Sequence, residues 1–359
     1  MNIDFANLNR QYLRYKDEID AAMQNVIDNS SFIMGPDVFA LEEELQAYTG
    51  AKHAITCSSG TDALLLAMMA LDIKAGDEVI TTPFSFIATA ETIAFLGATP
   101  VFVDIDEETY NIDVTKIEET ITSKTKAIMP VSLYGQPCDM DEINALAKKY
   151  KLKVIEDAAQ SFGATYKGEK SCNLSDIGCT SFFPAKPLGC FGDGGAVFTN
   201  DDALAEKIRS LRVHGQSKRY HHQYIGMGGR MDTLQAAVLR VKLRYYEEDL
   251  KERQDVAAQY AKNIKISSIK KDRTSAWAQF SLRVKDRDAL QKTLKEKGIP
   301  TAVHYPKPLH LQECFSYLGY KEGDFKVAEK VSQEIMSLPM NPDLNEEEKD
   351  YIRNIFRGL

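Results

Sequence analysis

Between residues 52 and 212, short apolar runs rich in β-branched residues alternate with longer segments of helical periodicity. Apolar strands joined by helices are typical of a mainly parallel sheet that is buried on both faces. The runs predict strands at His53–Cys57, Glu78–Thr82, Pro100–Asp104, Ala127–Leu133, Val154–Asp157, Cys179–Phe183 and Ala196–Thr199. The segments between them predict helices at Gly60–Leu71, Ala88–Leu96, Val114–Ile121, Asp139–Tyr150 and Asp202–Leu211.

The pattern changes after this region. Thr233–Tyr260 predicts a long amphipathic helix with one break, which marks the passage to a second domain. There, Ala278–Val284 alternates with period two, like a half-buried antiparallel strand. A helix at Arg287–Lys297 and a strand at Pro300–His304 follow. We expect an α/β fold with a mostly parallel seven-stranded sheet in a large domain, residues 1–235, and a smaller C-terminal α+β domain, residues 236–359.

Composition narrows the function classes. The net charge is −8 and no basic stripe stands out, which argues against a nucleic-acid partner. The first residues are polar and no run of about 18 apolar residues occurs, so we expect neither a signal peptide nor a membrane span. Six cysteines without CxxC or metal-ligand spacing indicate reduced thiols, a cytoplasmic protein and no metal site. Dinucleotide and P-loop phosphate motifs are also absent from the sequence.

Three short segments at predicted strand ends carry candidate chemistry, because ligands of parallel sheets bind at that edge. Gly60 and Thr61 begin a helix after a strand, where backbone amides favour an anion, although many such turns use these residue types. Asp157 ends a strand and is suited either to cap a helix or to hold a pyridinium nitrogen protonated.

The third segment is SFFPAKPLG, residues 181–189. Lys186 there is surrounded by apolar and proline residues with no adjacent acid, whereas an ordinary lysine in such a turn is solvated. Desolvation lowers the pKa of a lysine and exposes the neutral amine that Schiff-base formation requires. The hydroxyl of Ser181 is a candidate phosphate ligand. An anion-binding turn, an acid and a lysine in this order fit large pyridoxal-phosphate (PLP) aminotransferases.

Several blocks make a resemblance specific: SSGTDAL (58–64), FIATAET (86–92), VSLYGQ (131–136), IEDAAQSFGA (155–164) and SFFPAKPLG (181–189). With them, the chain resembles the DegT/DnrJ/EryC1/StrS family of PLP-dependent nucleotide-sugar aminotransferases from residue 9 to residue 340. The resemblance implies the aspartate-aminotransferase-like fold, fold type I. It also implies a homodimer with shared active sites and L-glutamate as amino donor, released as 2-oxoglutarate.

The resemblance assigns roles by position. Lys186 would form the Schiff base with PLP and then carry the proton between carbon atoms. Asp157 would pair with the pyridine nitrogen, Gln160 would bond the phenolic oxygen, and Phe86 would stack on the ring, although a buried core phenylalanine is the ordinary alternative. The phosphate ligands would be Gly60, Thr61 and Ser181.

Other positions bear on the substrate. Relatives carry an Asn two residues before an Arg that reaches the partner's cofactor phosphate; here Gly228 precedes Arg230, which puts that contact in doubt. The block VHYPKPLH (303–310) resembles enzymes that aminate C3 of a keto sugar, and Arg230, His304 and Tyr305 would face the sugar. The charged residues of the segment 214–222 would reach a nucleotide diphosphate, unless the segment is simply solvated: Lys218, Arg219, His221 and His222.

The resemblance therefore implies amination of a UDP-linked 3-keto-N-acetylglucosamine, neutral or uronic acid, for lipopolysaccharide or another surface glycan. A dTDP-linked 3-keto-6-deoxyhexose or a nucleotide-linked 4-keto sugar is the alternative within the class. A PLP/iron–sulfur dehydratase would carry His in place of Lys186. A non-catalytic PLP-binding regulator is the alternative in a different class.

Overall fold

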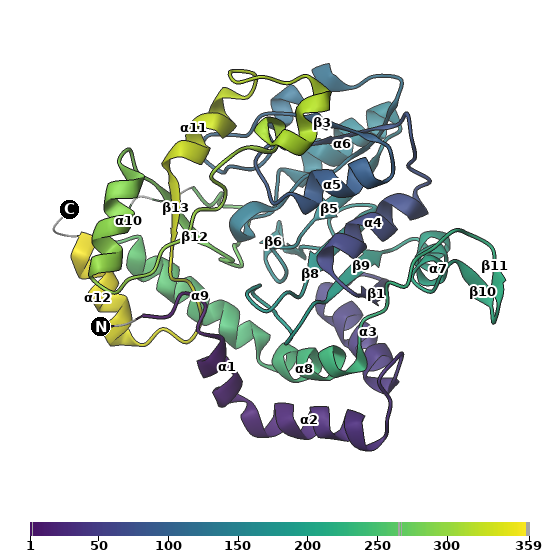
Figure 1. Cartoon of the computed structure of the whole chain (residues 1–359), viewed down its shortest axis with the longest axis horizontal. Coiled ribbons are helices and arrows are strands. Elements are labelled where there is room, and N and C mark those ends of the chain that lie inside the picture. The colour runs from purple at the N-terminus through teal and green to yellow at the C-terminus, as the bar shows by residue number, and fades with distance from the viewer. Residues whose placement is uncertain (2, 265, 267, 357–359) are drawn as a thin grey trace.

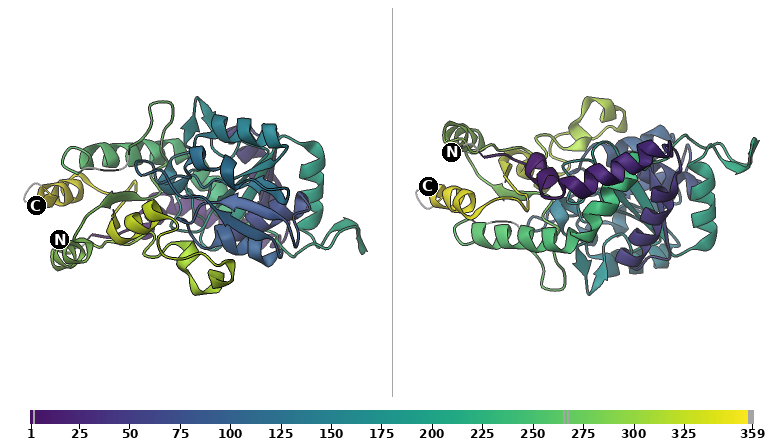
Figure 2. Two further views of the ribbon diagram at one scale, coloured as in Figure 1. Left: turned by 90° about the horizontal axis from the view of Figure 1, so that it is seen from above. Right: turned by 90° about the horizontal axis from the view of Figure 1, so that it is seen from below.

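The computed structural model describes residues 1, 3–264, 266 and 268–356. A large α/β unit occupies the centre of the molecule, a smaller unit that contains both chain ends lies on one side, and a hairpin projects on the opposite side (Figures 1 and 2). The two units correspond in kind to the α/β and α+β parts that the sequence predicts.

The large unit is built on a seven-stranded sheet of order β1-β9-β8-β5-β4-β2-β3. β9 runs antiparallel to both neighbours and the remaining strands pair in parallel, so the mostly parallel seven-stranded sheet is confirmed. The strands are β1 (His53–Cys57), β2 (Glu78–Thr81), β3 (Thr99–Phe102), β4 (Thr125–Ile128), β5 (Lys153–Asp157), β8 (Ile177–Ser181) and β9 (Gly195–Thr199).

Both faces of the sheet are buried, as near-continuous apolar strands require. Ile55 packs in a cluster with α4 and α7, whereas its neighbour Ala54 packs in a cluster with α3 and α8, because successive side chains of a strand point to opposite faces. The helices of this unit are α2 (Lys16–Asp28), α3 (Pro36–Thr49), α4 (Gly60–Ala70), α5 (Ala88–Phe95), α6 (Met140–Tyr150), α7 (Asp202–Leu211) and α8 (Thr233–Arg244).

The smaller unit pairs two antiparallel strands and packs them against helices around Tyr260, Phe280 and Ile352. Ile3 joins the same core, and its amide donates to the Gly298 carbonyl at 3.2 Å. The N-terminal segment therefore packs with the C-terminal part of the chain. The elements are β12 (Phe280–Arg283), β13 (Ile335–Leu338), α1 (Leu8–Arg14), α9 (Tyr246–Tyr260), α10 (Arg287–Glu296), α11 (Lys326–Glu334) and α12 (Glu346–Phe356).

Short elements complete the fold. Two-residue strands β6 and β7 form one small hairpin, and β10 with β11 forms the projecting one. Their bounds are β6 (Thr165–Tyr166), β7 (Glu169–Lys170), β10 (Gln216–Lys218) and β11 (His221–His222). The 3-10 turns are η1 (Val114–Lys116), η2 (Glu118–Thr120), η3 (Leu133–Gly135), η4 (Leu309–Leu311) and η5 (Glu313–Leu318).

Two predicted elements are wrong in kind. The helix expected at Val114–Ile121 is the pair of turns η1 and η2, because this run of Val, Thr and Ile has low helix propensity. The strand expected at Pro300–His304 is a single bridge between Ala302 and Ser337. Pro300 has no N–H to donate and the His304 carbonyl bonds Tyr134, so the ladder stops there.

Of two other predictions, one is correct in kind but has different bounds, and the other is confirmed. The predicted strand Ala127–Leu133 ends at Ile128 as β4, shortly before Pro130. The break expected within Thr233–Tyr260 is confirmed, since α8 ends at Arg244 and α9 begins at Tyr246.

Candidate active site

Four predicted site residues meet at the carboxyl edge of the sheet. Asp157 is the last residue of β5 and Ser181 the last of β8, while Gly60 is the first residue of α4. Lys186 lies in the connection from β8 to β9. This is the edge at which parallel sheets bind ligands, so the topology itself gathers these side chains.

Gly60 and Ser181 approach each other closely. A Cβ atom on Gly60 would lie 2.5 Å from the Ser181 Cβ, so only glycine permits this distance. Ser59 caps α4 by accepting a hydrogen bond from the Asp62 amide at 3.0 Å. Thr61 follows in the first helical turn. Amides at a helix amino end attract anions, so the Ser181 hydroxyl and this helix end form a suitable cradle for a phosphate.

The Asp157 carboxylate is buried and held by two donors. Thr89 Oγ1 donates to Oδ2 at 2.8 Å, and the Ala159 amide donates to Oδ1 at 3.2 Å. Burial raises the pKa of Asp157, while these two bonds and the charge of Lys186 act in the opposite direction. A buried carboxylate of this kind is stabilised by a nearby cation, such as a protonated ring nitrogen.

Lys186 lies in a turn that its own connection and α8 hold in place. The Lys186 amide donates to the Phe183 carbonyl at 2.8 Å. The ammonium of Lys242, on α8, donates to the Gly189 carbonyl at 2.5 Å. Burial lowers the pKa of the Lys186 amine, and the Asp157 charge offsets part of this shift. The Lys186 amine therefore loses its proton more readily than a solvated lysine does, and it lies near a buried carboxyl group.

Aromatic and amide groups line the same edge. Phe86 is not a core residue: its side chain is 53% exposed, and its ring centroid lies 6.3 Å from that of Tyr305. Gln160 Nε2 donates to the Tyr305 hydroxyl at 3.2 Å. Phe86, Gln160 and Tyr305 are thus brought together, and Phe86 is exposed enough to contact a ligand.

His304 lies beside this group with its ring held in a hydrogen bond. Its Nδ1 is 2.9 Å from Ser337 Oγ, and burial together with the charge of Lys186 lowers the pKa of His304 to about 4. The imidazole is therefore neutral near pH 7 and is available as a hydrogen-bonding group rather than as a cation.

Arg230 lies close to the phosphate cradle. The Ser58 amide donates to the Gly229 carbonyl at 3.0 Å, which places Arg230 next to the turn before α4. Gly228 pairs with Val213, and a Cβ atom on Gly228 would meet His214 Cε1 at 3.1 Å. A side chain at position 228 would therefore require His214 to move.

The charged hairpin is not gathered with these residues. The hairpin of β10 and β11 projects beyond α7 at the end opposite the smaller unit (Figure 2), and it carries four exposed residues, of which Arg219 lies in its turn: Lys218, Arg219, His221 and His222. Within one chain, these four side chains face solvent and not the Lys186 turn.

Three residues of this site were not singled out from the sequence. Thr89 orients Asp157, Tyr134 bonds both Gln160 and His304, and Glu156, which precedes Asp157 in β5, is fully buried. Thr89 and Tyr134 fall within the blocks FIATAET and VSLYGQ, so the blocks contained the signal. Assigning a role to them required knowing which distant segments they contact.

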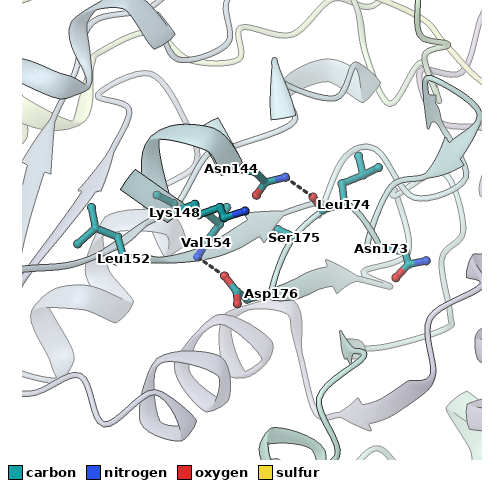
Figure 3. A pocket seen from close by; sticks show the side chains of 9 residues that line it. Asn144, Lys148, Leu152, Val154, Asn173, Leu174, Ser175 and Asp176 are labelled. Atoms are coloured by element: carbon teal, nitrogen blue, oxygen red, sulfur yellow. Dashed lines mark hydrogen bonds between the residues drawn. The ribbon is translucent and has the colours of Figure 1, made fainter. Parts of the chain in front are cut away.

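A hollow of about 550 Å³ lies elsewhere on the surface (Figure 3). Asn144 donates to the Leu174 carbonyl and Asp176 accepts from the Val154 amide, so its polar groups satisfy one another. It lies at the amino ends of β5 and β8, the sheet edge opposite Asp157, and is separate from the candidate site.

The described residues contain no group of three or more His, Cys, Asp and Glu side chains arranged to bind a metal ion. In the same ranges, no helix combines the length and the apolar character needed to cross a bilayer.

Comparison with known proteins identifies the class. The chain belongs to the DegT/DnrJ/EryC1/StrS aminotransferase family, which matches residues 14–357. It is 52% identical over 96% of both chains to the UDP-2-acetamido-2-deoxy-3-oxo-D-glucuronate aminotransferase of Pseudomonas aeruginosa. It is 47% identical to a pleiotropic regulatory protein of Geobacillus stearothermophilus, covering 98% of this chain and 97% of the relative. A dTDP-3-amino-3,6-dideoxy-alpha-D-galactopyranose transaminase of Aneurinibacillus thermoaerophilus is 44% identical, with the same coverage.

Solved structures agree in fold. DesV of S. venezuelae, crystallised with a ketimine intermediate, superposes with a TM-score of 0.96 at 37% identity, covering 99% of this chain and 98% of that one. NtdA of Bacillus subtilis with bound cofactor PMP superposes with a TM-score of 0.91 at 32% identity, covering 99% of this chain and 85% of that one. The fold is that of the DegT aminotransferases.

Proposed function

We propose that this protein is a PLP-dependent aminotransferase that transfers the amino group of L-glutamate to C3 of a UDP-linked 3-keto-N-acetylglucosamine-type sugar. The observation that carries the proposal is the Lys186 amine, its pKa lowered by burial, beside the buried carboxyl group of Asp157. Family membership and the 3-oxo sugar named for the P. aeruginosa relative support the reaction and the carbon atom.

The residues at the sheet edge fit PLP. Gly60, Thr61 and Ser181 would hold its phosphate, since the close approach of Gly60 to Ser181 leaves helix amides and a hydroxyl at one point. Asp157 would face the ring nitrogen, and Phe86 would cover a ring face. When bound, the cofactor supplies an electron sink for the carbon that loses a proton. Gln160 would donate to the phenolic oxygen.

Lys186 would carry the proton in both halves of the reaction. As a neutral amine, Nζ would accept a proton from the carbon on one side of the transferred nitrogen and return it to the carbon on the other side. An ionised Asp157 opposite the ring nitrogen would favour the protonated form of that nitrogen. L-Glutamate leaves as 2-oxoglutarate in the first half, and the sugar ketone leaves as an amine in the second.

Arg230, His304 and Tyr305 would bind the sugar. The pKa of His304, about 4, makes it a neutral hydrogen-bonding partner, so among these three only Arg230 supplies a positive charge for a sugar carboxylate. That arrangement favours the uronic acid, in agreement with the substrate named for the P. aeruginosa relative.

A homodimer with shared sites is part of the proposal. The β10–β11 hairpin extends away from its own chain, which suits contact with a second copy (Figure 1). Its cationic and histidine side chains would then reach the nucleotide diphosphate in the partner's site. Apolar side chains are exposed on the same molecule: Leu13, Phe32, Ile33, Phe39, Phe191 and Ile225.

The test is mass spectrometry of products from a panel of keto sugars with L-glutamate. We expect a UDP-linked 3-keto sugar to gain one amine with release of 2-oxoglutarate, and the uronic acid to react faster than the neutral sugar. Preferred amination of a dTDP-linked 3-keto-6-deoxyhexose or of a 4-keto sugar would replace the substrate assignment.

The similarity to a pleiotropic regulatory protein makes a non-catalytic regulator the second candidate function. Protein that binds PLP yet releases no 2-oxoglutarate with any sugar would favour it.

The amino-sugar product would serve lipopolysaccharide or another surface glycan. We place its synthesis in the cytoplasm, where six free thiols stay reduced.

A further inference from the structure

Tyr134 lies in η3, in the segment that follows β4 and bridges Asp157 through Val131, at the edge of the sheet where the site is assembled. Its side chain is buried and its backbone has a φ of 56°, in the left-handed region. A bulky residue persists in this conformation only where its surroundings hold it. One such contact is next in sequence: the Ala276 amide donates to the Gly135 carbonyl at 3.0 Å.

Tyr134 makes hydrogen bonds in two directions. Its backbone amide donates to Gln160 Oε1 at 2.7 Å, and its hydroxyl donates to the His304 carbonyl. Among the residues that the structure describes, only Tyr134 bonds to both. It thereby links the residue proposed to contact the cofactor with the backbone that carries the residues proposed to contact the sugar.

The His304 ring is fixed by a separate contact. Ser337 Oγ lies 2.9 Å from His304 Nδ1 and 2.9 Å from Ser281 Oγ. Tyr134 therefore holds the backbone of His304, while Ser337 orients its imidazole. The two contacts can be removed one at a time, although Ser281 lies near the Tyr134 hydroxyl and also bonds Ser337.

We propose that Tyr134 is a positioning residue that sets the His304–Tyr305 backbone relative to Gln160, and so aligns the sugar ketone with the cofactor in the second half of the reaction. The inference rests on the proposed function. L-Glutamate does not depend on His304 or Tyr305 in that scheme, so the first half should be independent of the Tyr134 hydroxyl.

Tyr134→Phe removes the hydroxyl and leaves the backbone amide that bonds Gln160. Each half-reaction is followed separately by the absorbance of the bound cofactor under single-turnover conditions. We expect the glutamate half-reaction to stay within about twofold of wild type, and the sugar half-reaction to lose roughly 5- to 10-fold in efficiency, as for one lost hydrogen bond. Calorimetry should show weaker binding of the amino-sugar product by a similar factor.

Tyr110→Phe is the matched control. Tyr110 is buried, and its ring packs against that of Tyr134 with centroids 6.0 Å apart, yet its hydroxyl makes no hydrogen bond within the described ranges. This variant should leave both half-reactions unchanged. Equal slowing of the two half-reactions in Tyr134→Phe, or no slowing in either, would overturn the proposal.

A crystal structure of Tyr134→Phe separates this inference from the proposed function. We expect the His304–Tyr305 backbone to move relative to Gln160, and an unmoved backbone contradicts the positioning role. If wild-type protein aminates no UDP-linked 3-keto sugar, the substrate assignment fails, while the structure of the variant still decides whether Tyr134 positions His304.

Discussion

The Lys186 amine, next to the buried carboxyl group of Asp157, defines the chemistry of this site. Burial lowers the pKa of Lys186, and the charge of the neighbouring Asp157 offsets part of that shift. The backbone of the Lys186 turn is held by the bond from the Lys186 amide to the Phe183 carbonyl and by the bond from Lys242 to the Gly189 carbonyl. Burial and Asp157 therefore set the pKa of the Lys186 amine, whereas Phe183 and Lys242 hold the turn that carries it.

We predict that Lys186→Ala abolishes the absorbance of lysine-bound cofactor and lowers turnover by on the order of 10⁴-fold, since it removes both the covalent partner and the proton carrier. Lys124→Ala, an exposed lysine before β4, is the control and should behave like wild type. Thermal unfolding should be similar in both variants. Turnover retained in Lys186→Ala would contradict the central role of this residue.

Glu156 gives a prediction for stability against pH. Burial raises its pKa to about 7, although Ser171, Cys172 and Ser132 donate to its carboxylate. An unfolded glutamate titrates near pH 4.3, so the native state binds this proton more tightly. The stability that the protonated Glu156 gives to the native state is therefore lost as the pH rises from about 4.3 to about 7, by up to roughly 4 kcal/mol.

Glu156→Gln removes that dependence because glutamine does not ionise. Relative to wild type, the variant should gain stability as the pH rises from 5 to 8, even if it is less stable at the lower pH through the lost acceptor for the Cys172 amide. Denaturant unfolding at several pH values measures this. Glu43→Gln, on an exposed part of α3, should show no such trend. A pH-independent difference for Glu156→Gln would contradict the prediction.

At the scale of elements, the site depends on how closely α4 approaches β8. Gly60→Ala would set a Cβ atom 2.5 Å from that of Ser181, so the two elements must separate. We predict at least roughly tenfold weaker cofactor binding, about 1.4 kcal/mol, measured by titration of cofactor absorbance.

Gly192→Ala is the matched control for that variant. Its new Cβ atom would meet the flexible end of Gln235 at 3.1 Å, which can shift, so cofactor affinity should stay close to that of wild type. Equal affinities of wild type and Gly60→Ala would show that the cradle does not need this close approach.

The elements also show which residues of the candidate site can be predicted from sequence patterns. Lys186, Asp157 and Gly60 were predictable because each stands at the end of an apolar run, where the topology of a parallel sheet dictates the neighbourhood. Thr89 and Tyr134 were not, because their roles depend on partners far along the chain, Asp157 and His304. The predicted strand Pro300–His304 does not form because the His304 carbonyl accepts a hydrogen bond from the Tyr134 hydroxyl and is not available to a neighbouring strand.

At the scale of the whole molecule, we predict from the projecting hairpin that each active site contains residues of both chains of a homodimer. We predict complementation between Lys186→Ala and a hairpin variant in which its four charged or histidine residues become alanine. The Lys186→Ala homodimer should be inactive, and the homodimer of the hairpin variant should be weakly active at low sugar concentration. Random exchange makes half of the dimers mixed, each with one intact site, so activity should recover to about a quarter of wild type.

The result of this mixing experiment depends on whether one chain or two chains build each active site. If each chain builds a complete site alone, the mixture should show only the average of the two homodimers. A monomer in sedimentation would also contradict the shared-site arrangement.

The antiparallel strand β9 has a consequence for how this protein folds. Since β8 and β9 are neighbours in the sheet and in the chain, the Lys186 turn between them can form from local contacts. The Gly60–Ser181 approach and the Asp157 edge need strands from distant parts of the chain, and such pairings form slowly. In refolding, the cofactor should therefore bind late, and its absorbance would report when the last long-range strand has joined.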